Sequence, residues 1–475
     1  MPGLRGPATL FSSYSNLGSE EKPLFWCSPR PDSPLYMPAS TSLLPTAPWS
    51  LPLLWLLFGV EVLFFTFWRK GLGPYWSPVV LYAVQLLLCL LLAHRLLGYR
   101  LRREPPLKSR EQQARFRFGA GAGLLATSLL LTAPVIRKVL LRVPLATIGT
   151  SSDIVPALQV YVRRFLQSEV VYKPISMFGY TFLPNYPPLQ WLPFVGAELA
   201  GIDYRWWAYG ALLLGLLIYE LVLARLALPW PEWVLKAALP VVVLHFNVII
   251  DKPMYSFTVE GLIIGFYCVL IAGIFSGSAW LKAAGLVLCL LSRYSLALWV
   301  PLYGLLLLYE NPRRGWLTAG LTGLGISLVF IPFMLTDPTI FFRAQLENFN
   351  IAVAVWQQID QQAPWLGPMH LFNGVGLAPW FYDLPGTLEE RIIRLQTVHF
   401  AVCTGVVVLA GWLFWRYHNR FDPRLAALLS FKAYLATFYA FLIIPYTYLA
   451  AVALFSSLFV MLVVSKKSAA FLEPV

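Results

Sequence analysis

Charged residues are scarce in this chain. Asp, Glu, Lys and Arg together make up only 12% of its 475 residues, whereas soluble domains contain roughly 25%. So little charge cannot cover a water-exposed surface, which excludes a soluble globular domain. Apolar runs of about 20 residues, long enough to cross a bilayer as helices, recur from about residue 49 onwards. These features predict an all-α, polytopic membrane protein.

Metal, nucleotide and disulfide patterns are also missing from the sequence. The five cysteines are scattered, show no zinc-ligand spacing and, being odd in number, form no complete disulfide framework. No glycine-rich nucleotide motif and no HExxH motif occurs. We therefore expect no bound metal and no cofactor.

The net charge of +13 does not indicate a nucleic-acid partner. Such a partner needs a basic face on a folded domain, whereas here the cations gather in short loops between apolar runs. These residues are Arg100, Arg102, Arg103, Lys108, Arg110, Arg115, Arg117, Arg313, Arg314, Arg416, Arg420, Arg424, Lys466 and Lys467. Short loops rich in Lys and Arg mark the cytoplasmic side of a membrane protein.

The apolar runs divide the chain into three parts. Residues 1–48, rich in Pro and Ser, are expected to be a disordered tail or the product of an over-extended start. Residues 49–118 contain two additional helices and a basic loop, and residues 119–475 form the main transmembrane domain. Spans are predicted at 49–68, 77–97, 119–141, 203–228, 233–250, 256–276, 315–335, 395–417, 424–443 and 446–464.

The run 279–309 is too long for one span and is interrupted by Ser292-Arg293-Tyr294-Ser295. A basic loop follows directly, so this end is expected on the cytoplasmic side. A helical hairpin that enters and leaves from the cytoplasm satisfies both conditions and gives about twelve membrane segments. The two long loops, 142–202 and 336–394, then lie on the external side.

Both external loops have features typical of a membrane interface. In the first loop, one helical face is apolar and consists of Ile154, Leu158, Val162, Phe165 and Leu166, which predicts a helix lying in the interface. The basic residues that break the charge rule are Arg137, Lys138, Arg142, Arg163 and Arg164, and headgroup phosphates can hold the last two. The second loop has an aromatic-rich run from Trp365 to Phe381, typical of an interfacial belt.

Asp153 is the candidate for chemistry in the first loop. It precedes the amphipathic segment, and Pro156 falls in the first turn, so one interpretation is a cap for backbone amides. The other is a general base that takes a proton from an acceptor hydroxyl during group transfer. The two roles are compatible because amide contacts keep a carboxylate ionised.

Two further motifs each have a structural and a functional interpretation. The turn Asn185-Tyr186-Pro187-Pro188 is extended, because a residue before proline avoids the helical region. It either connects the loop to the bundle or places Asn185 and Tyr186 in a pocket above the bilayer. Arg293 interrupts an apolar run, at a cost of roughly 3 kcal/mol on insertion scales. It either forms an internal ion pair, snorkels, or binds the phosphate of a lipid-linked substrate.

Polar residues near the external helix ends carry less information. His245, Asn247, Asp251 and Glu260 are interpreted first as interhelical hydrogen-bonding groups and second as ligands. His370, in the second loop, can reach the same side of the membrane.

From Asp153 to Phe194 the chain resembles the GT-C superfamily of integral-membrane glycosyltransferases, especially the bacterial polyprenyl-phosphate-mannose-dependent α-1,2-mannosyltransferase family. The similar features are the early Asp153, the segment from Val155 to Gln167, Tyr172-Lys173-Pro174 and Tyr186-Pro187-Pro188. Leu291-Ser292-Arg293-Tyr294-Ser295 resembles the hairpin tip of the family, with an arginine for the usual lysine, and Pro445-Tyr446-Thr447-Tyr448 resembles its late external turn. The resemblance covers about residues 119–464, and the first two spans depart from it.

The resemblance implies inverting transfer of a hexose, mannose in that family, from a polyprenyl-phosphate donor to a glycan or glycolipid acceptor. The site would face the exterior of a bacterial plasma membrane. Asp153 would be the base and Arg293 a phosphate contact, with Tyr172, Asn185, Tyr186 and His370 as further substrate-binding candidates. A phosphate-linked donor leaves as an anion, which needs positive charge but no nucleotide site.

Two other functions remain open. A transporter or flippase of lipid-linked glycans would have a similar topology, although transporters tend to contain internal repeats and no repeat relates the halves of this chain. A ligase or polymerase that joins completed glycans would share both the topology and the external loops.

Overall fold

The computed structural model describes residues 49–101, 108–150, 152–177, 179–359, 367–465 and 472–474. The predicted N-terminal tail, residues 1–48, lies outside this part of the chain. So do several residues of the predicted loops, namely Arg102, Arg103, Trp365, Lys466 and Lys467.

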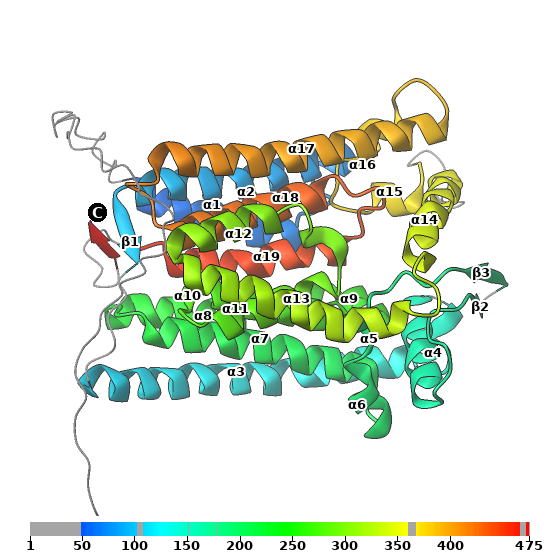
Figure 1. The fold of residues 1–475 in the computed structure, drawn as a ribbon, viewed down its shortest axis with the longest axis horizontal. Coiled ribbons are helices and arrows are strands. Elements are labelled where there is room, and N and C mark those ends of the chain that lie inside the picture. Colours follow the sequence, from blue (N-terminus) through cyan, green and yellow to red (C-terminus); the bar gives the residue numbers. More distant parts are fainter. Residues whose placement is uncertain are drawn as a thin grey trace, which may run out of the picture. The chain divides into compact units, whose positions relative to one another are not determined.

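Helices dominate the described residues (Figure 1). The bundle consists of α1 (Ser50–Thr66), α2 (Gly73–Leu96), α3 (Lys108–Arg142), α7 (Tyr204–Arg225), α8 (Trp230–Ile250), α9 (Lys252–Phe257), α10 (Glu260–Phe275), α11 (Ala279–Leu290), α12 (Val300–Glu310), α13 (Pro312–Met334), α17 (Leu388–Tyr417), α18 (Pro423–Ala440) and α19 (Thr447–Leu462). The long loops contain α4 (Ile154–Leu166), α5 (Pro188–Trp191), α6 (Phe194–Leu199), α14 (Ile340–Gln357), α15 (Met369–Phe372) and α16 (Ala378–Tyr382). Short antiparallel strands pair β1 (Tyr99–Leu101) with β4 (Leu472–Pro474) and β2 (Ile175–Met177) with β3 (Tyr180–Phe182).

Six helices in the described residues are long and apolar enough to cross a membrane, namely α2, α3, α7, α8, α13 and α17. This confirms the prediction of a helical membrane protein. A helix also lies on each of the other predicted spans, but α1, α10, α11, α12 and α19 are only 10–17 residues long. The total of about twelve membrane segments therefore stays a prediction.

Glycines bring α7 and α10 into direct backbone contact. A Cβ at Gly261 would lie 2.6 Å from the carbonyl oxygen of Ala208, and one at Gly265 would lie 2.6 Å from that of Ala211. Small residues allow this close approach between membrane helices. The contact fixes the first turn of α10, which begins at Glu260.

The interrupted run 279–309 folds as the predicted hairpin. Helices α11 and α12 are joined through a turn that contains the short 3₁₀ helix η2 (Tyr294–Leu296). An ion pair of 2.9 Å between Lys282, near the start of α11, and Glu310, at the end of α12, shows that the helices run antiparallel. Twelve residues of helix span only about 18 Å, less than the about 30 Å of a bilayer core, so neither helix crosses alone.

A buried polar network joins the first two helices of the bundle, α1 and α2, to its last two, α18 and α19. Lys432 of α18 and Glu61 of α1 form an ion pair of 2.8 Å with both side chains 0% exposed. Gln85 of α2 donates to Glu61 at 2.8 Å, and Ser457 of α19 donates to both carboxylate oxygens at 2.9 and 2.8 Å. These residues lie in four of the predicted spans, and no sequence pattern predicted the network.

Labelling of single cysteines can test the predicted sidedness. Four native cysteines are buried, so replacing Cys27 by Ser leaves a background of poorly reactive thiols. In that background Gln167→Cys, exposed after α4, should react with a membrane-impermeant maleimide in intact spheroplasts. Asn419→Cys, exposed between α17 and α18, should react only after the membrane is ruptured. The reverse pattern would overturn the predicted topology.

Candidate functional site

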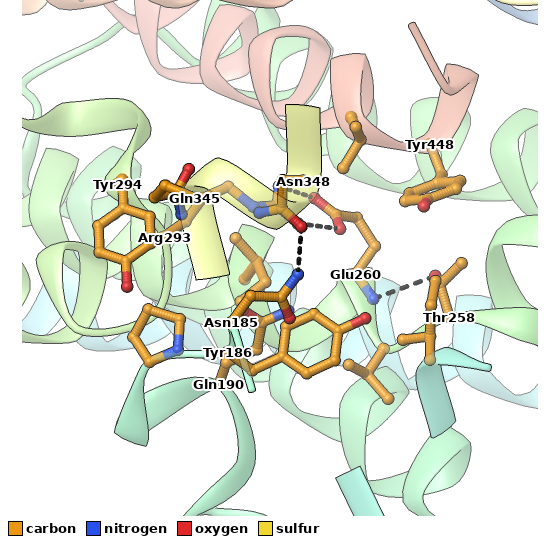
Figure 2. A pocket seen from close by; sticks show the side chains of 15 residues that line it. Asn185, Tyr186, Gln190, Thr258, Glu260, Arg293, Tyr294, Gln345, Asn348 and Tyr448 are labelled. Atoms are coloured by element: carbon orange, nitrogen blue, oxygen red, sulfur yellow. Dashed lines mark hydrogen bonds and ion pairs between the residues drawn. The ribbon is translucent and has the colours of Figure 1, made fainter. Parts of the chain in front are cut away.

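Elements of the two long loops, among them α4 and α14, lie at the same end of the bundle (Figure 1). A pocket of about 250 Å³ lies there (Figure 2). The first loop, the start of α10, the hairpin tip, α14 and the start of α19 all contribute to its walls. The lining residues are Ile154, Asn185, Tyr186, Pro187, Gln190, Thr258, Val259, Glu260, Ile263, Arg293, Tyr294, Gln345, Asn348, Tyr448 and Leu449. The pocket therefore brings together three of the residues selected from the sequence, Asn185, Tyr186 and Arg293.

The proline turn reaches the pocket because its backbone is fixed. Pro187 is extended, with ψ of 159°, and Pro188 is the first residue of α5, a position that suits its restricted φ. The amide of Leu189 donates to the carbonyl oxygen of Leu291 at 2.8 Å, which joins α5 to the hairpin. The turn therefore does both things that its sequence allowed: it connects the loop to the bundle, and it places Asn185 and Tyr186 in the lining of a pocket.

Tyr172 supports this turn and, within the described residues, does not line the pocket. Its hydroxyl donates to the carbonyl oxygen of Tyr186 and accepts from Nε1 of Trp191, each at 2.9 Å. Its ring is 3% exposed and packs against Phe341, with ring centroids 4.9 Å apart. In this structure Tyr172 acts on the pocket through Tyr186, as a positioning residue.

Arg293 forms a bidentate ion pair with Glu260 (Figure 2). Its Nη1 and Nη2 donate to the two carboxylate oxygens at 2.7 and 2.8 Å, and Nη1 also donates to the Tyr439 hydroxyl at 3.4 Å. The Glu260 side chain is 2% exposed and that of Arg293 is 18% exposed. The internal ion pair is thus the interpretation of Arg293 that the structure shows. These bonds use three of the five N–H groups of the guanidinium, so Arg293 retains the capacity to donate to a ligand.

Asp153 lies beside the pocket and does not cap α4. It occupies the N-cap position, but its side chain makes no capping bond and its backbone is already helical. Its carboxylate instead accepts a hydrogen bond of 2.9 Å from the hydroxyl of Tyr180. Burial, and then this contact with Asp153, raise the pKa of Tyr180 to about 12, so the phenol stays protonated at neutral pH. The capping interpretation is therefore not observed.

The charge of Asp153 also affects Tyr186, which lines the pocket. Burial first and the Asp153 charge second raise the pKa of Tyr186 well above its usual value. The next residue, Ile154, lines the pocket itself. Asp153 is thus the chain neighbour of a pocket residue but, within the described residues, does not line the pocket itself.

The amphipathic helix is present, and part of its predicted apolar face packs inside the protein. Val155, Leu158, Tyr161 and Val162 are buried, whereas Phe165 and Leu166 are 38% and 41% exposed. Tyr161 belongs to the buried side and stacks on Trp191, with ring centroids 6.1 Å apart. The location of this helix in the membrane interface stays a prediction.

Arg164 also differs from its predicted role as a headgroup contact. Its guanidinium donates to the carbonyl oxygens of Val171, Lys173 and Pro174 at 3.0, 2.6 and 2.9 Å. The structure therefore uses Arg164 to close the loop that follows α4.

His370 lies near the pocket without lining it, within the described residues. Its ring contacts that of Tyr446, with centroids 5.5 Å apart, and Tyr446 stacks on the pocket residue Tyr448 at 5.4 Å. Burial lowers the pKa of His370, so it is neutral at pH 7. A direct substrate contact by His370 stays a prediction.

Of the polar residues at the helix ends, Glu260 differs from the rest by lining the pocket. Asn247 accepts a hydrogen bond of 2.5 Å from Tyr255, and Asp251 lies 3.4 Å from Arg69. These are the interhelical contacts expected for this group. His245 contacts the ring of Phe246.

Several pocket residues were not singled out from the sequence, namely Gln190, Thr258, Gln345 and Asn348. Asn348 illustrates the reason. It accepts a hydrogen bond of 3.2 Å from Asn185, 163 residues away in the sequence. No local spacing links the two, and an isolated carboxamide in a loop carries no motif. Tyr448 belongs to the late turn Pro445-Tyr446-Thr447-Tyr448, and it lines the pocket although no role was predicted for it.

Comparisons of this chain with protein-family models, with curated proteins and with solved structures give no match. The resemblance to GT-C glycosyltransferases therefore rests on the residues of this chain alone. Groups of three or more His, Cys, Asp or Glu side chains able to hold a metal ion are not found in the described residues.

Proposed function

We propose that this protein is a membrane glycosyltransferase that moves a hexose, mannose in the family it resembles, from a polyprenyl-phosphate donor to an acceptor hydroxyl. The observation that carries the proposal is the polar pocket at the loop-bearing end of the bundle, with Arg293 in its wall and Asp153 beside it. The proposed location is a bacterial plasma membrane, with the site facing the exterior.

The proposed reaction is a single displacement with inversion. The acceptor oxygen attacks the anomeric carbon, and the bond between that carbon and the phosphate oxygen breaks. The polyprenyl phosphate leaves with the electron pair as an anion, and the acceptor proton passes to the carboxylate of Asp153. Attack opposite the leaving group inverts the configuration of the sugar.

Arg293 is placed to contact the leaving phosphate. Its charge is largely compensated by Glu260, so its contribution comes from the N–H groups that Glu260 and Tyr439 leave available. Hydrogen bonds from a fixed guanidinium stabilise charge that develops on an oxygen in the transition state. The ion pair thus holds the guanidinium in place for this task.

The position of the pocket favours transfer over transport. Transporter sites typically lie near the bilayer midplane, between repeats. This pocket is instead built from loop residues and helix ends, where a glycan or glycolipid acceptor and a membrane-dissolved donor can meet.

Incubation of the purified protein with a panel of radiolabelled polyprenyl-phosphate sugars tests the proposal. With a mixture of glycan and glycolipid acceptors present, we expect consumption of one donor and a product of inverted anomeric configuration. Translocation of intact donor across proteoliposomes, without release of the lipid phosphate, would instead identify a flippase.

The role of Arg293 can be separated from its role in folding. Arg293→Ala leaves the buried carboxylate of Glu260 unpaired, which is strongly destabilising. The double variant Arg293→Gln with Glu260→Gln removes both charges together and keeps polar side chains at both positions. We expect this variant to remain folded and to raise the apparent KM for the donor about ten- to a hundredfold, because a charged hydrogen bond of about 1.5–3 kcal/mol to the phosphate is lost. An unchanged donor titration in the folded variant would remove Arg293 from the donor site.

A further inference from the structure

The volume of the pocket limits what can enter it. Pockets for drug-sized ligands typically measure about 300–1,000 Å³, and this pocket measures about 250 Å³. A polyprenyl-linked sugar is larger than a drug-sized molecule, so only one end of it fits. The lining mixes apolar residues with four carboxamides and the Arg293–Glu260 ion pair, and these polar groups suit the sugar end better than the isoprenoid chain.

The charge of the lining favours a neutral group. Glu260 and Arg293 are its charged members, and they pair with each other. A phosphate inside the pocket would lack an uncompensated cation and is better placed at the rim. Neutral hydroxyl groups need no cation and can bind through hydrogen bonds alone.

Four carboxamides supply hydrogen-bonding groups suited to hydroxyls. Asn185, Gln190, Gln345 and Asn348 all line the pocket (Figure 2). Nδ2 of Asn185 donates to Oδ1 of Asn348 at 3.2 Å, while Oδ1 of Asn185 is buried with no partner among the described residues. Each carboxamide offers two donors and one acceptor oxygen, and a sugar hydroxyl can both donate and accept.

We infer that this pocket holds the transferred sugar ring and that Gln345 and Asn348 of α14 determine which sugar is accepted. The inference rests on the proposed function and deepens it. It assigns the reaction base to the first loop and sugar selection to the second. The hydrogen bond between Asn185 and Asn348 joins the two loops at the pocket wall.

A comparison of donors with and without single hydroxyl groups tests this assignment. The variants are Asn348→Ala and Gln345→Ala, and the matched control is Asn350→Ala, an exposed carboxamide on the same helix that does not line the pocket. For wild type and Asn350→Ala, we expect one monodeoxy donor to lower kcat/KM about tenfold, because it loses a hydrogen bond to a carboxamide of the pocket lining. For Asn348→Ala or Gln345→Ala, kcat/KM with the parent donor should fall by a similar factor. Removing the hydroxyl from the donor should then lower kcat/KM of these variants little further.

Binding of methyl hexosides, followed by ligand-observed NMR, separates the inference from the proposed reaction. Hexoside binding supports the sugar site if Asn348→Ala or Gln345→Ala weakens it and Asn350→Ala does not. If such binding occurs but no donor is turned over, the sugar site stands and the transfer reaction is wrong. Turnover in which both pocket variants behave like Asn350→Ala overturns the sugar-site inference and leaves the transfer reaction intact. Absence of both hexoside binding and turnover overturns both.

Discussion

Replacing Asp153 by Asn is expected to lower the rate of sugar transfer by about 10²–10⁴-fold, the usual contribution of a general base. The amide cannot accept the proton of the acceptor hydroxyl, whereas its oxygen can still accept the hydrogen bond from Tyr180. Because Asp153 makes no capping bond to α4, the substitution removes no backbone contact. The loss should therefore appear in kcat, measured with donor and acceptor both saturating, and thermal unfolding should be unchanged.

The matched control for this variant is Asp337→Asn. Asp337 is a carboxylate near the start of the second long loop, where it bonds Thr339 at 2.8 Å and pairs with Arg343. It lies outside the pocket lining, so turnover should stay near that of wild type. Retention of wild-type turnover by Asp153→Asn would show that Asp153 is not the base. Equal losses in both variants would point to a general effect of loop charge.

The helical architecture could be predicted because a bilayer imposes a simple rule on sequence. A chain that crosses hydrocarbon must satisfy its backbone polar groups within helices, and apolar runs therefore mark the helices directly. The same rule identified the break at Arg293, since a cation within an apolar run is costly unless it is paired or binds a ligand. In the structure Arg293 is paired with Glu260.

The pocket could be predicted only in part. Asn185 and Tyr186 stand next to prolines that fix the backbone, so their sequence neighbourhood indicated their importance. Gln345 and Asn348 belong to α14, a helix not predicted within the second loop, and they join the pocket only through folding. Contacts between residues more than 160 positions apart, such as that of Asn185 with Asn348, leave no trace in local spacing.

Replacing Lys432 by Met is expected to destabilise the protein by about 3–5 kcal/mol, because it leaves the carboxylate of Glu61 buried without a cation. Both side chains are 0% exposed, so water cannot replace the lost partner. Glu61, Gln85, Lys432 and Ser457 come from four different helices, so we expect the packing of α1 and α2 against α18 and α19 to loosen. Thermal unfolding in detergent, together with limited proteolysis between α2 and α3, measures this effect.

Two comparisons show whether the effect comes from an unpaired charge. Replacing Glu61 by Leu in the Lys432→Met background removes both charges and should recover most of the lost stability, since buried ion pairs are often replaceable by apolar residues. Arg115→Gln breaks an exposed pair with Glu111, whose side chains are 79% and 54% exposed, and should change stability by only about 0.5 kcal/mol. If the double variant is as unstable as Lys432→Met, the network stabilises the bundle through its hydrogen bonds to Gln85 and Ser457 and not through charge compensation.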